Sequence, residues 1–157
     1  MGIALSTAGV KVGYVVETTK GTRPVTGYKS IPDLKGTPEL NPSPNALDAT
    51  TLAQTEFKTY VKGLKDLGGA LAFTANFTEE LMTEWNGLVA AYQAAKADGK
   101  AVWFCIQHPD LTKAAYFTGE PSEMGLPSAG VDAIFETNVY VTPTSAPIWE
   151  AKPTAAE

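Results

Sequence analysis

The sequence predicts a mainly β (α+β) fold, a two-sheet β-sandwich or barrel flanked by one α-helix. Apolar and polar residues alternate over several short segments, as they do in strands that bury one face. Only residues 79–98 carry apolar side chains at helical spacing over a long stretch. Prolines and glycines separate the short segments at close intervals, which is typical of mainly β domains.

Length and composition restrict the possible classes of protein. The 157 residues, 44% of them hydrophobic, suffice for one domain with a core. Twelve basic and 17 acidic residues give a net charge of -5, which argues against a nucleic-acid-binding protein. Cys105 is the only cysteine, so an internal disulfide is excluded and a reducing compartment is favoured. The N-terminal residues do not resemble a signal peptide, and no apolar run approaches the ~20 residues of a membrane helix. We therefore expect a soluble protein that is made in the cytoplasm and not secreted.

The first third of the chain is predicted to contain strands and a long loop. Residues 10–17 alternate as a strand, residues 21–26 read as a turn, and residues 27–31 form a short strand. Four prolines then fall within residues 32–45, and proline removes backbone donors and restricts the residue before it. We expect a long irregular loop over residues 32–47, mobile in a free subunit and ordered in an assembly.

A β-hairpin is expected next. Residues 55–61 alternate as its first strand, after a polar, Thr-rich approach. Residues 63–69, Gly-Leu-Lys-Asp-Leu-Gly-Gly, read as its turn. Residues 70–77 alternate again as the second strand.

The helix is the clearest element of the sequence. Thr78 is placed as its N-cap, Glu79 and Glu80 follow in the first turn, and Gly99 is placed to end it. Its apolar stripe comprises Leu81, Trp85, Leu88, Val89 and Tyr92. This stripe predicts that the helix covers the apolar face of a sheet.

Three further strands are expected at residues 101–108, 113–119 and 131–141, with a loop over residues 120–130. From Thr142 the chain becomes rich in Pro and Ala, which favours a loose tail in which Trp149 could still dock. The predicted organisation is an N-terminal arm over residues 1–9, a domain over residues 10–141, and a C-terminal tail over residues 142–157.

No set of residues predicts catalysis, a cofactor or a metal. A strand places Cys105 and His108 on opposite faces, and one Cys with one His cannot form a usual zinc site. The glycine-containing segment 63–69 lacks Walker spacing and precedes a strand, so it is not a phosphate loop. Asp132 and Glu136 could form a carboxylate pair, but their alternation is typical of a solvated sheet face. We expect a protein that is not an enzyme.

Several short motifs, taken in order, resemble the pattern of siphophage tail tube (major tail) proteins. They span residues 10–143 and include an Ile-Pro strand end at Ile31-Pro32 and a closing strand near Thr142-Pro143. The other pieces are residues 48–52 (Asp-Ala-Thr-Thr-Leu), 58–60 (Lys-Thr-Tyr), 63–66 (Gly-Leu-Lys-Asp), 68–69 (Gly-Gly) and 73–77 (Phe-Thr-Ala-Asn-Phe).

The resemblance implies a β-sandwich with a flanking helix that assembles into hexameric rings, and these stack into a tube that conducts DNA into the host. It implies partners that include a tape-measure protein and tail terminator or tip proteins, with DNA passing without specific binding and no membrane. The location would be the virion. The long loop would contact neighbouring subunits or the next ring, with Leu34, Leu40, Leu47 and Leu52 as apolar contact residues.

A lumen that conducts DNA is expected to avoid unpaired basic groups, because each lysine or arginine adds a phosphate contact. Asp132, Glu136 and Asn138 on the last long strand are candidates for this lining, as is Glu56 on the first hairpin strand. The alternative is that these side chains lie on an outer, solvated surface.

Two other functions remain open from the sequence. One is a monomeric or trimeric β-sandwich that binds carbohydrate or protein, for which exposed Trp149 and Tyr28 would be the aromatic contacts. The other is a different tail component, such as a tail terminator or the tube subunit of a contractile tail.

Overall fold

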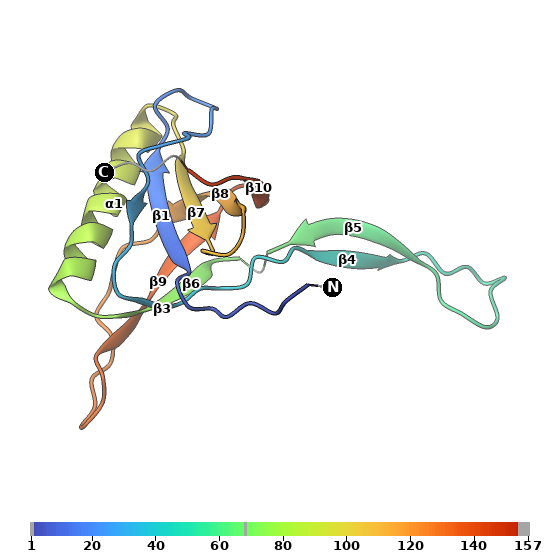
Figure 1. Ribbon diagram of the computed structural model, residues 1–157. Coiled ribbons are helices and arrows are strands. Elements are labelled where there is room, and N and C mark those ends of the chain that lie inside the picture. Colours follow the sequence, from blue (N-terminus) through green and yellow to red (C-terminus); the bar gives the residue numbers. More distant parts are fainter. Residues whose placement is uncertain (1, 68, 154–157) are drawn as a thin grey trace.

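The computed structural model describes residues 2–67 and 69–153. Their main body is an eight-stranded sheet in the order β2-β1-β7-β8-β9-β6-β3, in which β10 also pairs with β8 (Figure 1). Its strands are β1 Lys11–Val16, β2 Lys29–Ser30, β3 Leu34–Gly36, β6 Leu71–Asn76, β7 Val102–Gln107, β8 Lys113–Pro121, β9 Glu136–Pro143 and β10 Ile148–Ala151. A separate two-stranded sheet consists of β4 Ser43–Asp48 and β5 Tyr60–Asp66. The mainly β class with one helix is confirmed.

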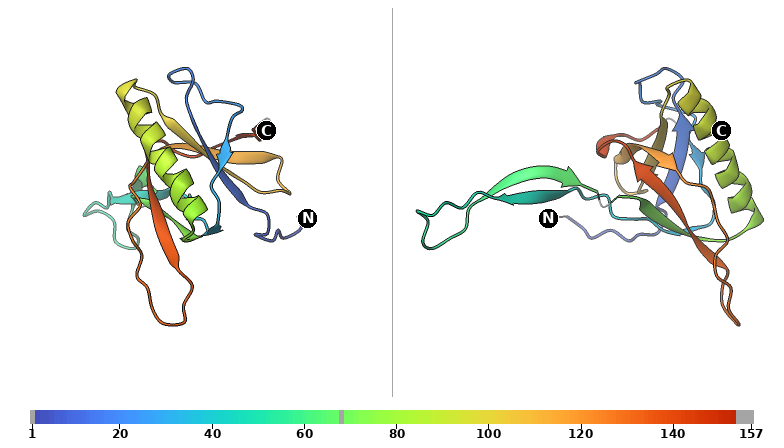
Figure 2. Two further views of the ribbon diagram at one scale, coloured as in Figure 1. Left: turned by 90° about the vertical axis from the view of Figure 1, so that its left-hand side faces the viewer. Right: turned by 180° about the vertical axis from the view of Figure 1, so that it is seen from behind.

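Strand β8 is the point at which the main sheet curls. Along one edge it pairs with β7 over Ala115–Gly119. Its other edge is shared, since residues 113–116 pair with β10 and residues 119–121 pair with β9. The sheet therefore bends into a half-barrel around one core, as the two views in Figure 2 show.

Helix α1, Glu79–Ala97, begins and ends as its sequence predicts. The backbone N–H of Leu81 donates to the Thr78 hydroxyl at 3.1 Å, which caps the first turn. The chain leaves the helix through Gly99 at a φ of +71°, a conformation that favours glycine. Because the helix lies against one face of the curled sheet (Figure 1), the predicted stripe faces the core.

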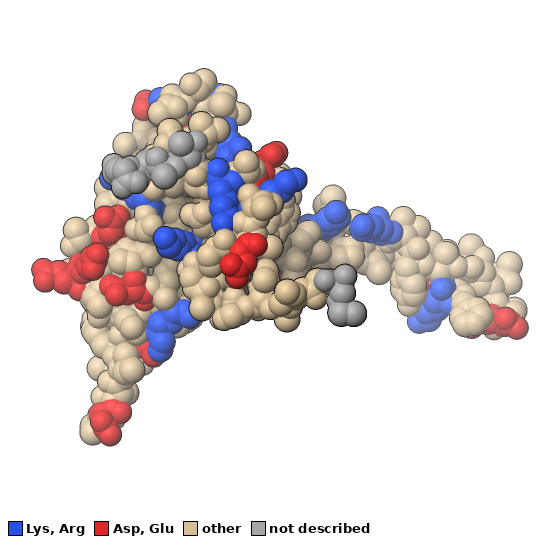
Figure 3. Space-filling model, viewed as in Figure 1, with Lys and Arg blue, Asp and Glu red and all other residues tan. Residues whose placement is uncertain are grey.

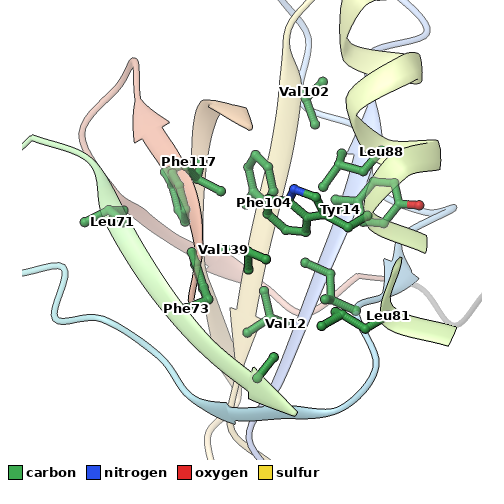
Figure 4. Packing of buried hydrophobic residues seen from close by; sticks show 14 residues of the cluster. Val12, Tyr14, Leu71, Phe73, Leu81, Leu88, Val102, Phe104, Phe117 and Val139 are labelled. Carbon is green, nitrogen blue, oxygen red and sulfur yellow. The ribbon is translucent and has the colours of Figure 1, made fainter. Parts of the chain in front are cut away.

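The core lies between the helix and the sheet, and Figure 4 shows its packing. Leu81, Trp85 and Leu88 of the helix are at most 1% exposed. They belong to one cluster with side chains from five strands, among them Val12, Tyr14, Leu71, Phe73, Val102, Phe104, Phe117, Val139 and Val141. The rings of Phe104 and Phe117 lie 5.4 Å apart and nearly parallel. This cluster holds both halves of the curled sheet together, and a second, smaller cluster contains Cys105, Ala114 and Tyr116.

The C-terminal segment is ordered as far as it is described, unlike the loose tail that we expected. Strand β10 pairs with β8, with Trp149 opposite Ala115. The Tyr116 hydroxyl donates to the Ala151 carbonyl at 2.6 Å, and the Arg23 guanidinium lies 4.1 Å from the centre of the Tyr116 ring. The proline-rich composition hid this strand, because β10 is only four residues long.

The predicted hairpin over residues 55–77 is wrong in its pairing. Strand β5 runs through the segment expected to be its turn and pairs with β4, inside the expected long loop, whereas β6 pairs with β9 and β3. Gly63 explains the error, because it was read as a turn residue. A Cβ there would lie 2.7 Å from the Asn45 carbonyl oxygen, beside the register shift between Pro44 and Ala46. Glycine here permits close approach of two strands at a bulge.

The predicted strand over residues 131–141 begins five residues late, at Glu136 in β9. Val131 begins the apolar alternation in the sequence, but it is 100% exposed, and Ile134 beside it is 70% exposed. Asp132 has a φ of +57°, which is incompatible with an extended strand. Residues 122–135 instead form a long loop that projects from the body (Figure 1).

Candidate assembly surfaces

The most prominent surface feature is an arm over residues 43–66, which extends away from the body (Figure 1). Its two strands pair only with each other, and residues 49–59 connect them at the tip. At about 3.3 Å per residue, the six residues of β4 make a shaft of about 20 Å. A two-stranded ribbon has little stability of its own in water. The arm therefore has the geometry of an element that gains contacts from another molecule.

The arm tip is held in shape by local hydrogen bonds. The Thr59 backbone N–H donates to the Thr50 hydroxyl at 2.8 Å, and the Thr50 N–H donates to the Asp48 carboxylate at 2.9 Å. The Thr51 N–H donates to the Gln54 side-chain oxygen at 2.9 Å. These hydrogen bonds connect the two sides of the tip loop.

Large apolar side chains on the arm are exposed to solvent. Leu52 is 104% and Phe57 is 81% exposed at the tip. Leu47, Tyr60, Val61 and Leu64 are each more than half exposed along the shaft. A cluster of exposed apolar side chains on a projecting element is typical of a protein–protein contact. Sequence reasoning did not select Phe57, although an aromatic residue within a Thr-rich polar segment was a usable signal.

The structure divides the four leucines that we expected at a subunit interface. Leu34, on β3, and Leu40 are partly buried and pack against the core cluster of the body. Leu47 lies on the arm shaft and Leu52 at the arm tip. Only the last two are therefore exposed enough to serve as contact residues.

A second projection is the loop over residues 122–135, which sequence reasoning partly assigned to a strand. Its root is fixed to the body, since Trp85 Nε1 donates to the Ser122 carbonyl at 2.8 Å and the Phe77 N–H donates to the Phe135 carbonyl at 2.8 Å. Beyond the root, Leu126, Val131 and Ile134 are each at least 70% exposed. The loop therefore offers a second apolar contact surface on another side of the body (Figure 2).

The outer face of strands β6 and β9 is polar and nearly neutral. The Thr74 hydroxyl donates to the Asn138 side-chain oxygen at 3.0 Å across the two strands. Glu136 forms an ion pair with Lys35, so the charge of this carboxylate is compensated. This face and the loop over residues 122–135 line an open hollow of about 750 Å³.

The four residues expected to line a lumen are not brought together. Glu136 and Asn138 share the outer face of β9, because they are two residues apart on one strand. Asp132 lies in the projecting loop, and Glu56 lies at the tip of the arm. The polar face of β6 and β9 is thus the one surface that combines two of the four.

Charges are unevenly distributed over the surface, and Figure 3 shows one side of it. Acidic side chains gather near the start of helix α1, where Glu79 and Glu80 lie, and lysines occur along the arm. Further Lys and Arg side chains lie in a discontinuous row down the middle of the body in this view.

The structure shows the surroundings of Cys105 and His108, which were considered above as a possible nucleophile or metal site. Burial raises the pKa of the Cys105 thiol to about 11, so it is a poor nucleophile. His108 Nε2 contacts the Ser6 carbonyl, and His108 Nδ1 accepts from the Asp110 N–H at 3.0 Å. Within residues 2–67 and 69–153, no group of three or more His, Cys, Asp or Glu side chains could hold a metal ion.

The described part of the chain contains no helix that is both long and apolar enough to span a membrane.

Comparison with known proteins identifies the fold but no family. No protein-family model matches the chain, and no curated protein matches it. Among solved structures, it is similar to a chain in the cryo-EM structure of the anti-feeding prophage (AFP) baseplate, 6-fold symmetrised. The TM-score is 0.59 at 8% sequence identity, and the match covers 96% of this chain and 98% of that chain. At this identity the match establishes a shared fold over nearly the whole of both chains.

Proposed function

We propose that this chain is a structural subunit of a bacteriophage tail or tail-derived particle, and that it forms hexameric rings that stack into a tube. The observation that carries the proposal is the full-length fold match with a chain of a baseplate solved as a six-fold symmetrised assembly. The match covers nearly all of both chains, so the whole described fold is shared and not one part of it. The motif order that resembles tail tube proteins supports the same role.

The exposed arm supports assembly with other copies. The ribbon projects about 20 Å and exposes Leu52 and Phe57 at its tip, which is typical of an element that contacts another protein. In a ring or tube, the same ribbon would lie on a neighbouring subunit and bury these side chains. The two projections extend from different sides of an asymmetric body, which favours heterologous contacts that close into rings or continue as filaments.

In the proposed tube, the polar face of β6 and β9 lines the lumen. Thr74 and Asn138 leave this face hydrated and uncharged, and the Glu136 carboxylate is paired with Lys35. DNA would pass such a wall without forming many phosphate contacts. A tape-measure protein would occupy the lumen before DNA, and tail terminator and tip proteins would bind the ends. The role proposed here is structural, with no catalysis.

A component at the end of the tube is the second candidate, because the matched chain belongs to a baseplate. A baseplate or terminator subunit with this fold would form one ring and not a long tube. The two candidates share the ring and differ in whether rings of this chain stack on each other.

Negative-stain imaging of the concentrated, purified protein tests both candidates. The tube role predicts rods of uniform width, with six-fold symmetry in end views. Isolated six-fold rings that do not stack would favour the end component. A protein that stays monomeric or trimeric at every concentration and binds glycans would contradict both and support the binding module.

A further inference from the structure

A small apolar groove lies on the body next to the root of the arm. Its volume is about 290 Å³. Leu40 and Ile106 line it and pack against the core, whereas Leu111 and Trp149 line it and are 38% and 57% exposed. The rest of the lining is apolar at Val10, Pro38, Ala115 and Pro147 and polar at Thr37, Asn41, Gln107 and His108. An open apolar groove with an exposed tryptophan is the type of surface that receives an apolar anchor.

We propose that this groove receives the arm tip of a second copy of the chain, with Phe57 as the main anchor and Leu52 beside it. This proposal rests on the proposed function, since it specifies how the self-assembling subunits contact each other. It assigns a receiving site that the fold match does not provide.

The arm cannot occupy the groove of its own chain. The groove is lined by residues 37–41, which lead directly into strand β4 at Ser43. From that root the shaft carries the tip about 20 Å away from the body. An arm tip that fills the groove must therefore belong to another copy.

Each copy carries both a tip and a groove at separate places, so the same contact can repeat from one copy to the next. The tip of one subunit would bind beside the arm root of the next, whose own tip then extends to a third subunit. Such a head-to-tail contact is heterologous, and it closes into a ring or continues as a filament. This is the symmetry that a ring-forming subunit requires.

The arm tip is better suited to the groove than the other exposed apolar segments. Its loop is held by the Thr50, Thr59 and Gln54 hydrogen bonds, so little entropy is lost on docking. It also carries an aromatic anchor, and aromatic residues are enriched among residues that dominate binding. The loop over residues 122–135 uses its aromatic residue internally, since the Phe135 ring lies 5.0 Å from that of Phe77.

The contact is expected to be weak when it is made once. A phenylalanine buries roughly 150–250 Å², whereas a stable interface buries about 1,200 Å² or more in total. The exposed shaft residues Leu47, Tyr60 and Leu64 would add area on the neighbour. Assembly through this contact should therefore depend on concentration.

Engineered cysteines beside the two surfaces test the proposal without removing an apolar side chain. Glu56→Cys marks the tip and Asp110→Cys marks the groove wall next to Leu111; both positions are exposed. The native Cys105 is 1% exposed, so it should not react. The two variants are mixed at a concentration at which the unmodified protein is oligomeric and then oxidised, with a mass tag on one. We expect a disulfide-linked mixed dimer, which forms only if the two Cβ atoms approach to about 4 Å.

Two matched controls make the test specific. Adding Phe57→Ser to the Glu56→Cys chain should reduce the mixed dimer by roughly tenfold, the loss expected for a dominant anchor. Asp132→Cys, on the other projecting loop, should give no mixed dimer with Asp110→Cys.

Three results would overturn the proposal. They are equal linkage from Asp132→Cys, linkage that survives Phe57→Ser, or no Glu56–Asp110 linkage in a protein that does form oligomers. Failure of the unmodified protein to form oligomers at all would instead reject the proposed function together with this contact.

Discussion

Trp85 connects helix α1 to both the core and the root of the second projecting loop. Its ring is 1% exposed, and its Nε1 donates to the Ser122 carbonyl at 2.8 Å. Trp85→Ala should lower the free energy of unfolding by about 3–5 kcal/mol, because it opens a large cavity in the core. Chemical denaturation measures this loss. Met82→Ala, on the exposed side of the same helix, serves as the control, and a loss below about 1 kcal/mol for Trp85→Ala would show that the core is not as described.

The buried carboxylate of Glu17 links the turn that follows β1 to the start of β7. Its oxygens accept from the Ala101 N–H at 2.9 Å, the Trp103 Nε1 at 2.8 Å and the Gly21 N–H at 3.2 Å. Burial alone would raise the pKa of Glu17, but these hydrogen bonds and the nearby Lys100 outweigh it and lower the pKa below its usual value. Sequence reasoning did not identify this network, because Ala101 and Trp103 lie far from Glu17 along the chain.

Glu17→Gln should lower the stability at pH 7 by about 1–3 kcal/mol, because its amide nitrogen would face a backbone or indole N–H donor. The folded-state pKa lies below the unfolded value. The ionised group therefore stabilises the fold above the unfolded pKa, and this contribution is lost as the pH falls through the folded pKa. Denaturation at several pH values should show the difference between the two proteins shrinking below about pH 4.5. A difference that is constant from pH 7 to pH 3 would contradict the assignment.

At the scale of elements, the sequence predicted periodic segments well and pairing poorly. Helix α1, with its Thr78 cap and Gly99 end, and strand β1 follow their predicted bounds closely, because local periodicity and caps determine them. The pairing of β4 with β5 was missed, because Gly63 serves both as a strand residue at a bulge and as an apparent turn residue. The late start of β9 was missed because alternation in residues 131–135 imitates a strand.

The arm is predicted to be an independent element that the body does not need for folding. Leu34, on β3, pairs with Ala75 of the body, whereas β4 and β5 pair only with each other. Replacing residues 43–66 with a short Gly/Ser linker should therefore change the free energy of unfolding by no more than about 0.5 kcal/mol. Removing Leu34–Gly36 should cost clearly more, because it takes a strand from the main sheet. Equal losses in the two variants, measured by denaturation, would mean that the arm belongs to the core.

At the scale of the whole molecule, the candidate surfaces were only partly predictable. Sequence reasoning placed Glu136 and Asn138 on one face, because two residues along a strand return to the same side. It could not place Asp132, whose position depends on the loop, or Glu56, whose position depends on the length of the arm. Which surfaces become interfaces depends on the three-dimensional arrangement of the projections, which periodicity does not encode.

If the outer face of β6 and β9 lines the lumen, added positive charge on this face should slow the passage of DNA. Asn138→Lys with Thr74→Lys would place unpaired lysines on the outer face of β6 and β9, and should slow DNA delivery while tubes still assemble. The effect should be strongest at low salt, where screening is weakest. Asp132→Lys, on the projecting loop, is the control and should leave delivery unchanged. Normal delivery through intact tubes of the double variant would remove this face from the lumen.

Self-assembly through the arm is the central claim, and sedimentation across a concentration series tests it most directly. The intact protein is compared with the variant in which a linker replaces residues 43–66. We predict that the intact protein forms species of six subunits or more as its concentration rises, while the variant stays a folded monomer at every concentration. Monomers of both proteins throughout the series, or equal assembly of both, would contradict the account.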